Sequence, residues 1–198
     1  MKVSEACRLC YAETFSKRVG QSVWGADAPR RFFGEKHWNE PINWNKKAEK
    51  EGQRKRVFCA SMADWAEDRR DLDPWREKLW DLIAATPWLD WLLLTKRHDK
   101  IVEFVPKAWL DDWPANVWPG ITVETQKWAD IRIPHLLRLP AQVRWLSVEP
   151  LLGPLDLERY LLPDYKKRGA LNWAGGVNWV IVGGESGHGA KPDRKSVV

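Results

Sequence analysis

Five short apolar runs divide the chain, and most of them are nearly continuous rather than alternating. Strands that are buried on both faces of a parallel sheet show this pattern, because neither face meets water. The runs therefore predict five strands, at residues 56–61, 88–95, 117–123, 143–148 and 179–183.

The segments between these runs carry helical patterns. Residues 74–86 follow Asp73, a suitable N-cap, and place Pro74 at the first helical position. Residues 124–139 keep their apolar side chains mainly on one side, and Pro134 is expected to kink or split that helix. Strands that alternate with helices predict right-handed βα units. The fold class is therefore α/β, with parallel βα repeats in a partial (β/α) barrel or an open parallel sheet.

The length of 198 residues suits a single α/β domain that spans residues 1–198. Residues 20–55 are polar, contain proline and tryptophan, and show no clear period, so they are predicted to form an irregular excursion. Residues 188–198 have no apolar periodicity and are predicted to be a loose tail.

The formal charge of +5 permits a nucleic-acid partner, although the basic residues are scattered in small clusters that also suit a solvated surface. The fifteen tryptophans are unusual for this length. Some could stack on bases, but most fall within strand and helix patterns, which favours core packing.

No apolar run is long enough to span a membrane, and the N-terminus has no apolar signal segment. With three cysteines and no export signal, a cytoplasmic location is expected and a disulfide framework is not.

Each predicted strand is followed by a charged residue. These residues are Asp64, Lys96, Glu124, Glu149 and Glu185. A single acid after a strand is often a helix N-cap or a first-turn acid. In parallel α/β folds, however, the strands' carboxyl ends share one edge and carry the functional residues. The five residues together predict a pocket at this edge, with Lys96, Glu124 and Glu149 as candidate catalytic residues.

The fifth strand runs into Gly183, Gly184, Glu185 and Ser186. Glycines after a buried strand let backbone N–H groups approach a ligand, and Glu185 could accept from an ammonium group. These four residues are candidate cofactor-binding residues, and a tight turn that merely ends the strand is the structural alternative.

Cys7 and Cys10 form a C-x2-C pair, which can chelate one metal or belong to one cluster. A zinc site would need further ligands, for which Cys59 and His37 are the remaining candidates. Cys59 is predicted to be a buried core residue within a strand. A redox dithiol is a further alternative, without the preceding strand of a thioredoxin-like motif.

The blocks KVSEACRLCYAE, VFCASMADW, LLLTKR, NVWPGITVETQKWADIRIPHLL, VRWLSVEPLLGPLDL and WVIVGGESGHGAKP occur in this order along almost the whole chain. In these blocks the chain resembles the phage-associated three-cysteine-motif family, the gene product thirty-seven/sixty-eight-like proteins, a domain of unknown function. Members of that family look like divergent radical S-adenosylmethionine proteins.

The resemblance implies a phage-encoded or mobile-element-encoded iron–sulfur protein with a 4Fe–4S cluster and S-adenosylmethionine as cofactors. It implies Cys7 and Cys10 as metal ligands, an unknown substrate, and a protein encoded nearby as a possible partner. In the family pattern C-x6-C-x2-C the first cysteine would fall one position before Met1, and the family continues beyond the DRKSVV ending. The chain is therefore expected to be truncated at both ends. The alternative is a non-catalytic nucleic-acid-binding or partner-binding module with a structural zinc.

Overall fold

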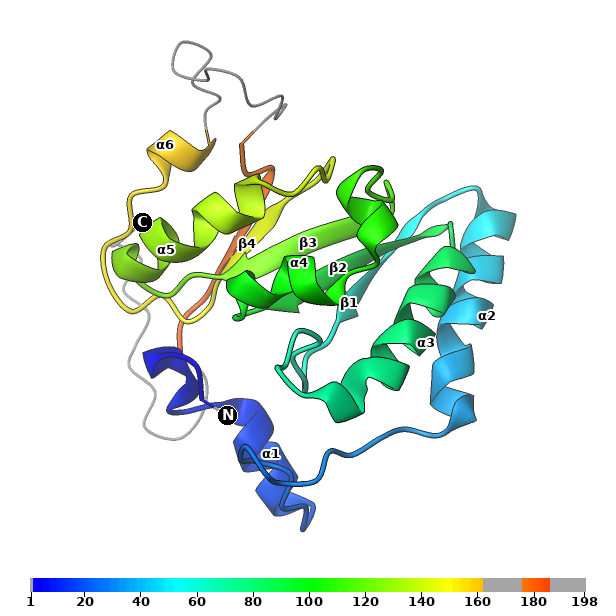
Figure 1. The fold of residues 1–198 in the computed structure, drawn as a ribbon, viewed down its shortest axis with the longest axis horizontal. Coiled ribbons are helices and arrows are strands. Elements are labelled where there is room, and N and C mark those ends of the chain that lie inside the picture. Colours follow the sequence, from blue (N-terminus) through cyan, green and yellow to red (C-terminus); the bar gives the residue numbers. More distant parts are fainter. Residues whose placement is uncertain (1, 162–175, 186–198) are drawn as a thin grey trace.

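The computed structural model describes residues 2–161 and 176–185, and its centre is a curled, all-parallel sheet that forms a half-barrel (Figure 1). The five strands follow one another across the sheet in sequence order. They are β1 (Lys55–Cys59), β2 (Leu89–Thr95), β3 (Val117–Thr122), β4 (Trp145–Val148) and β5 (Trp179–Val182). The predicted α/β class and all five predicted strands are confirmed.

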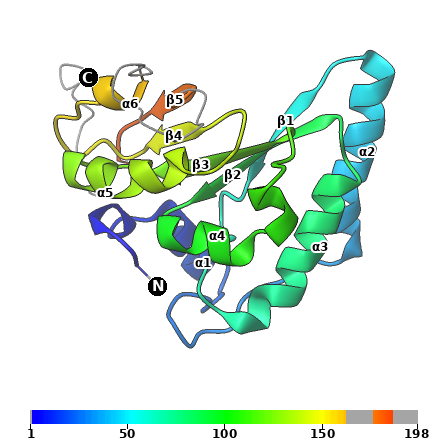
Figure 2. The same cartoon turned by 45° about the horizontal axis from the view of Figure 1, so that its top comes forward.

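Helices connect the strands and also precede the sheet (Figure 2). The two N-terminal helices are α1 (Tyr11–Arg18) and α2 (Glu35–Glu51). The connecting helices are α3 (Asp73–Ala84), α4 (Ile101–Phe104), α5 (Gln126–Leu137) and α6 (Glu158–Leu161). None of the described helices is long and apolar enough to cross a membrane.

The main core lies between one face of the sheet and helices α3, α4 and α5. Leu93, Ile121 and Leu146 of neighbouring strands are fully buried there, together with Ile83 of α3 and Ile133 of α5. Parallel pairing holds these strands in register, with Leu93 opposite Pro119 and Ile121 opposite Leu146. Buried apolar area of this kind is the main stabilising contribution to a domain.

The opposite face of the sheet carries aromatic side chains and an arginine. The Arg56 guanidinium lies over the rings of Trp118 and Trp179, at 5.6 and 5.2 Å from the ring centroids. The Trp145 ring is fully buried on this face, and its indole N–H donates to the Trp118 carbonyl at 3.0 Å. Gly120, the residue opposite Trp145 in the register, leaves room for that ring.

The prediction of an irregular segment at residues 20–55 is wrong for its second half, where α2 forms. The buried side of α2 consists of Pro41, Asn45 and Ala48, which have helical spacing but little apolar character. Asn45 is there because its side-chain oxygen accepts from the Trp88 backbone N–H at 2.8 Å. Because a proline and an asparagine occupy buried positions of α2, the sequence lacks the periodic apolar residues that would have indicated a helix.

Two further local predictions need correction. Helix α5 runs through Pro134 without being split. Helix α3 begins at Asp73 rather than after it, and the Asp73 side chain accepts from the Arg76 guanidinium instead of capping the helix. Ser186 and the predicted tail at 188–198 lie outside the described residues.

Candidate functional site

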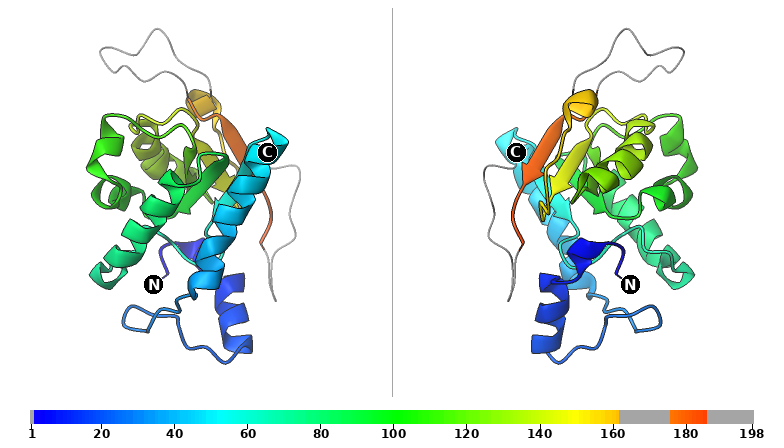
Figure 3. Two further views of the ribbon diagram at one scale, coloured as in Figure 1. Left: turned by 90° about the vertical axis from the view of Figure 1, so that its right-hand side faces the viewer. Right: turned by 90° about the vertical axis from the view of Figure 1, so that its left-hand side faces the viewer.

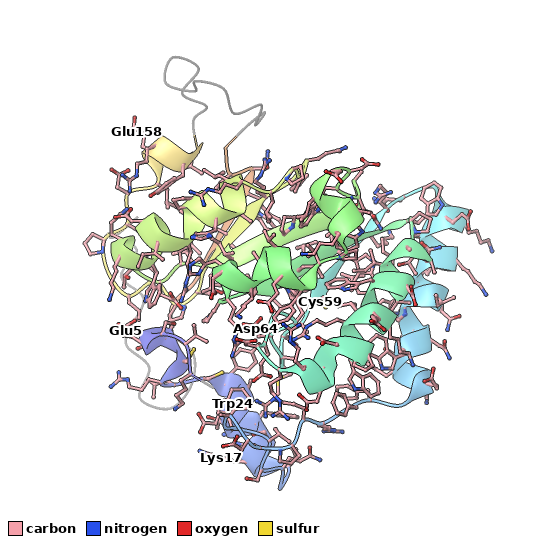
Figure 4. All side chains as sticks on the ribbon, in the orientation of Figure 1. Glu5, Lys17, Trp24, Cys59, Asp64 and Glu158 are labelled. Atoms are coloured by element: carbon pink, nitrogen blue, oxygen red, sulfur yellow. The ribbon has the colours of Figure 1, made fainter. Side chains whose placement is uncertain are left out.

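The five charged residues predicted at the strand ends share one edge of the sheet, as expected for parallel strands. The N-terminal segment lies at this same end of the molecule (Figure 3). In Figure 4, Asp64 is labelled near the end of β1 and Glu5 is labelled on the N-terminal turn below the strand ends. The common edge is confirmed, and the chemical roles of these residues stay predictions.

Asp64 organises the loop that follows β2. Its carboxylate accepts from the Thr95 hydroxyl at 2.6 Å, from the Lys96 backbone N–H at 3.2 Å and from the Arg97 guanidinium at 2.6 Å. It also accepts from the Ala66 backbone N–H at 3.1 Å. These contacts occupy the carboxylate and make Asp64 a link between the loops that follow β1 and β2.

Glu124 is fully buried, and both of its carboxylate oxygens have partners. Oε2 accepts from Arg132 at 2.8 Å, and Oε1 accepts from the Ser4 hydroxyl at 2.5 Å. The Lys96 ammonium is 3.8 Å from Oε1, which is an ion-pair distance rather than a hydrogen bond. Burial lowers the pKa of Arg132, and the Glu124 charge opposes that effect. Glu124 was predicted as a candidate catalytic residue, but its carboxylate has no exposed atom to offer a substrate.

Glu149 is the exposed member of the predicted catalytic set. Its Oε2 accepts weakly from the Ser147 hydroxyl at 3.3 Å, and its other oxygen lies beside Gly183. A Cβ atom on Gly183 would be 2.6 Å from Glu149 Oε1, so a larger residue there would displace this exposed carboxylate. The contact with Glu149 is thus a structural explanation for Gly183, which was predicted as a cofactor-binding residue.

Cys7 and Cys10 lie on the segment that covers this edge. Cys7 ends a single 3₁₀ turn, Glu5–Cys7, and its sulfur is 3.5 Å from the Val3 backbone nitrogen. Both thiols are free and partly exposed. The Tyr11 hydroxyl donates to the Ser61 carbonyl at 2.5 Å, which joins the end of the motif to the loop after β1. Burial raises the pKa of Tyr11, and the nearby Cys10 and Glu149 raise it further.

Two hollows adjoin the cysteine segment. The larger, of about 410 Å³, is lined by Ser4, Glu5, Arg8, Leu152 and Glu185. Glu185, the acid predicted after β5, thus lies across this hollow from the N-terminal turn. The smaller hollow, of about 190 Å³, adjoins Arg8 and Cys10. An exposed arginine and an acid facing one hollow suit a ligand that carries both charges.

Cys7 and Cys10 were predicted as metal ligands, and they offer two thiols. No group of three or more histidine, cysteine or acidic side chains with metal-binding geometry is present among residues 2–161 and 176–185. Cys59 ends β1 and is half-buried, less buried than predicted, and burial raises the pKa of its thiol to about 12. Among the described residues, the two predicted cysteine ligands are therefore fewer than an iron–sulfur cluster or a structural zinc needs.

Ser4, Tyr11 and Arg132 belong to this site but were not predicted from the sequence. Arg132 carried a signal, because it falls on the buried stripe of α5 with Ala129, Ile133 and Leu136. An arginine within an apolar stripe indicates a buried ion pair. Ser4 and Tyr11 carried none, since their partners lie 120 and 50 residues away in sequence.

The chain was also compared with known proteins. No curated protein and no solved structure matches it significantly. One family profile does match, over residues 1–198, and its description is "Protein of unknown function (DUF5131)". Because the match spans the whole sequence, the chain belongs to the DUF5131 family.

Proposed function

We propose that this chain is an iron–sulfur protein that resembles radical S-adenosylmethionine enzymes, with Cys7 and Cys10 as two of its cluster ligands. One observation carries the proposal. The segment with both thiols lies on the carboxyl edge of a parallel half-barrel, where Ser4 and Tyr11 contact the residues that follow β3 and β1. That edge is where α/β barrels bind cofactors and substrates.

The surroundings of the thiols are consistent with this role. Arg8 and Glu185 face the larger hollow and suit the carboxylate and ammonium of an amino-acid moiety such as that of S-adenosylmethionine. Lys96, whose ammonium is 3.8 Å from Glu124, and the exposed Glu149 lie on the substrate side in this proposal. The cluster would supply an electron to the cofactor when bound.

Two thiolates are fewer than the three that hold a 4Fe–4S cluster with one open iron in the enzymes it resembles. We therefore propose cluster binding and assign no reaction and no substrate. A cytoplasmic protein encoded by a phage or mobile element, with a partner encoded nearby, is part of the same proposal and rests on the family resemblance.

A second candidate, binding of single-stranded nucleic acid, is favoured by an exposed aromatic pair. Phe32 and Phe33 are 44% and 47% exposed. One face of Phe32 stacks on Trp75, with ring centroids 4.3 Å apart, and the Arg31 guanidinium lies 5.0 Å from the Phe33 ring centroid. Aromatic faces beside a cation are typical of surfaces on which bases stack. In this alternative the cysteines would bind a structural zinc.

Reconstitution distinguishes the two candidates. The purified chain is incubated without oxygen with ferrous iron and sulfide, and iron, sulfide and zinc are then measured per chain. We expect a brown protein whose iron is lost in Cys7→Ala and in Cys10→Ala but retained in Cys59→Ala. A colourless protein that takes up zinc would contradict the proposal, as would iron binding that is unchanged in both motif variants.

A further inference from the structure

The turn that carries Cys7 is attached to the body of the protein at two adjacent residues. Ser4 donates its hydroxyl to Glu124 Oε1 at 2.5 Å, and Glu5 Oε2 accepts from the Trp128 indole N–H at 2.9 Å. Their partners lie immediately before α5 and within its first turn. Both contacts therefore tie the turn to the same part of the sheet edge.

The two partners on the α5 side are themselves joined through Arg132. Its guanidinium binds Glu124 at 2.8 Å and lies over the Trp128 ring at 4.0 Å from the centroid. It also donates to the Thr122 carbonyl at the end of β3, at 2.6 Å. Ser4, Glu124, Arg132, Trp128 and Glu5 thus form a closed ring of contacts between the turn and the β3–α5 connection.

The cysteine motif has a separate attachment on its other side. Tyr11 directly follows Cys10 and donates to the Ser61 carbonyl beyond β1 at 2.5 Å. The two thiols are therefore bracketed in sequence, with the ring of contacts before Cys7 and the Tyr11 contact after Cys10. A short segment fixed at both ends has few conformations, so its side chains keep one position.

We infer that Glu124 is a positioning residue that holds the cysteine motif on the sheet edge, rather than a residue that contacts substrate. Its carboxylate is fully buried, and both oxygens accept hydrogen bonds within the ring. Removal of the Ser4 or Glu124 end opens the ring and leaves the contact of Glu5 with Trp128 to hold this side of the turn. The inference deepens the proposed function and rests on it only for the identity of the metal that the thiols bind.

Thiol alkylation of the metal-free protein tests this inference without any cofactor. Iodoacetamide labelling is followed over time, and trypsin, which cuts after Arg8, separates Cys7 from Cys10 for mass spectrometry. Cys59 serves as an internal standard, because it lies in β1, outside the N-terminal turn, and burial raises the pKa of its thiol to about 12. Ser4→Ala is the main variant, and Ser22→Ala, at an exposed position, is its matched control.

In Ser4→Ala the Cys7 labelling rate should rise by roughly tenfold, the factor expected for loss of a hydrogen bond to an ionised group. The Ser4 hydroxyl also lies 3.9 Å from the Cys7 sulfur, so the Glu124 variants, which keep Ser4, decide whether Glu124 positions the motif. The rates of Cys59 and of the Ser22→Ala control should not change. Glu124→Gln keeps an oxygen that can accept from Ser4, so its Cys7 rate should lie between those of the wild type and Glu124→Ala.

An unchanged Cys7 rate in Ser4→Ala and Glu124→Gln would overturn the inference. A parallel rise at Cys59 in both variants would also overturn it, because the sheet would then have opened together with the motif. Failure of the proposed function looks different. The wild-type chain would then fail to bind iron, whatever the labelling rates of the metal-free variants.

Discussion

Gly120 on β3 offers a stringent test of the sheet, because an added methyl group has nowhere to go. A Cβ atom at this position would lie 2.2 Å from Trp145 Cε2 and 2.4 Å from Trp145 Nε1, far inside van der Waals contact. The indole cannot move aside freely, since it is fully buried and donates to the Trp118 carbonyl at 3.0 Å. Gly120→Ala should therefore strain the core and displace the indole.

The expected loss follows from two contributions. Overpacking of a core by one carbon costs about 1–3 kcal/mol of unfolding free energy. Loss of the indole hydrogen bond adds about 1 kcal/mol. Gly120→Ala should thus lose about 2–4 kcal/mol in urea unfolding followed by circular dichroism.

Gly153→Ala is the matched control, because a Cβ atom there has no heavy atom within 4 Å. Its unfolding free energy should stay within about 0.5 kcal/mol of the wild type. The double variant Gly120→Ala with Trp145→Phe should lose less than the sum of the two single variants, since the smaller ring makes room. If Gly120→Ala proved as stable as Gly153→Ala, the pairing of Gly120 with Trp145 would be refuted.

Three further predictions concern titratable side chains. Glu124→Ala should cost about 3–5 kcal/mol of unfolding free energy because it leaves Arg132 buried without its partner. The exposed control Glu51→Ala should leave the unfolding free energy nearly unchanged, and equal losses in the two variants would contradict the burial of the pair. Burial, and then the charge of His135, lower the pKa of His98. The contribution of His98 to the unfolding free energy should therefore be constant above about pH 7 and fall as the pH drops below about 6.5, because the unfolded chain binds the proton more readily. In urea titrations, the unfolding free energy of His98→Gln should fall less over this range than that of the wild type. An identical fall would exclude His98 as the cause. Cys59, whose thiol pKa is raised to about 12, should react with iodoacetamide more slowly than the two motif cysteines at about pH 8; equal rates in the folded protein would contradict its burial.

Much of the fold could be predicted because the strands are apolar on both faces and their order follows the sequence. The common edge of Asp64, Lys96 and Glu149 follows from parallel pairing alone, without knowledge of any side-chain contact. Helix α2 could not be predicted in the same way, because its buried side presents Pro41 and Asn45 rather than aliphatic residues. A hydrogen bond takes the place of apolar contact there.

The candidate site was less predictable, because its organisation depends on contacts between distant parts of the chain. The role of Glu124 shows the limit. Its place after β3 indicated a functional acid, but only the structure shows that Ser4, which is 120 residues away in sequence, and Arg132 occupy both oxygens. Gly183 shows the same limit, because its closeness to Glu149 Oε1 is seen in the structure and is not indicated by the turn in the sequence.

The proposal that Cys7 and Cys10 bind iron at the strand ends is tested most directly by locating the metal. Crystals of the anaerobically reconstituted chain would be measured on both sides of the iron absorption edge, and an anomalous difference map would be calculated. Iron should appear at the Cys7 and Cys10 sulfurs, on the carboxyl edge of the sheet next to the hollow lined by Arg8 and Glu185. Iron bound elsewhere, or zinc and no iron at these sulfurs, would contradict the account.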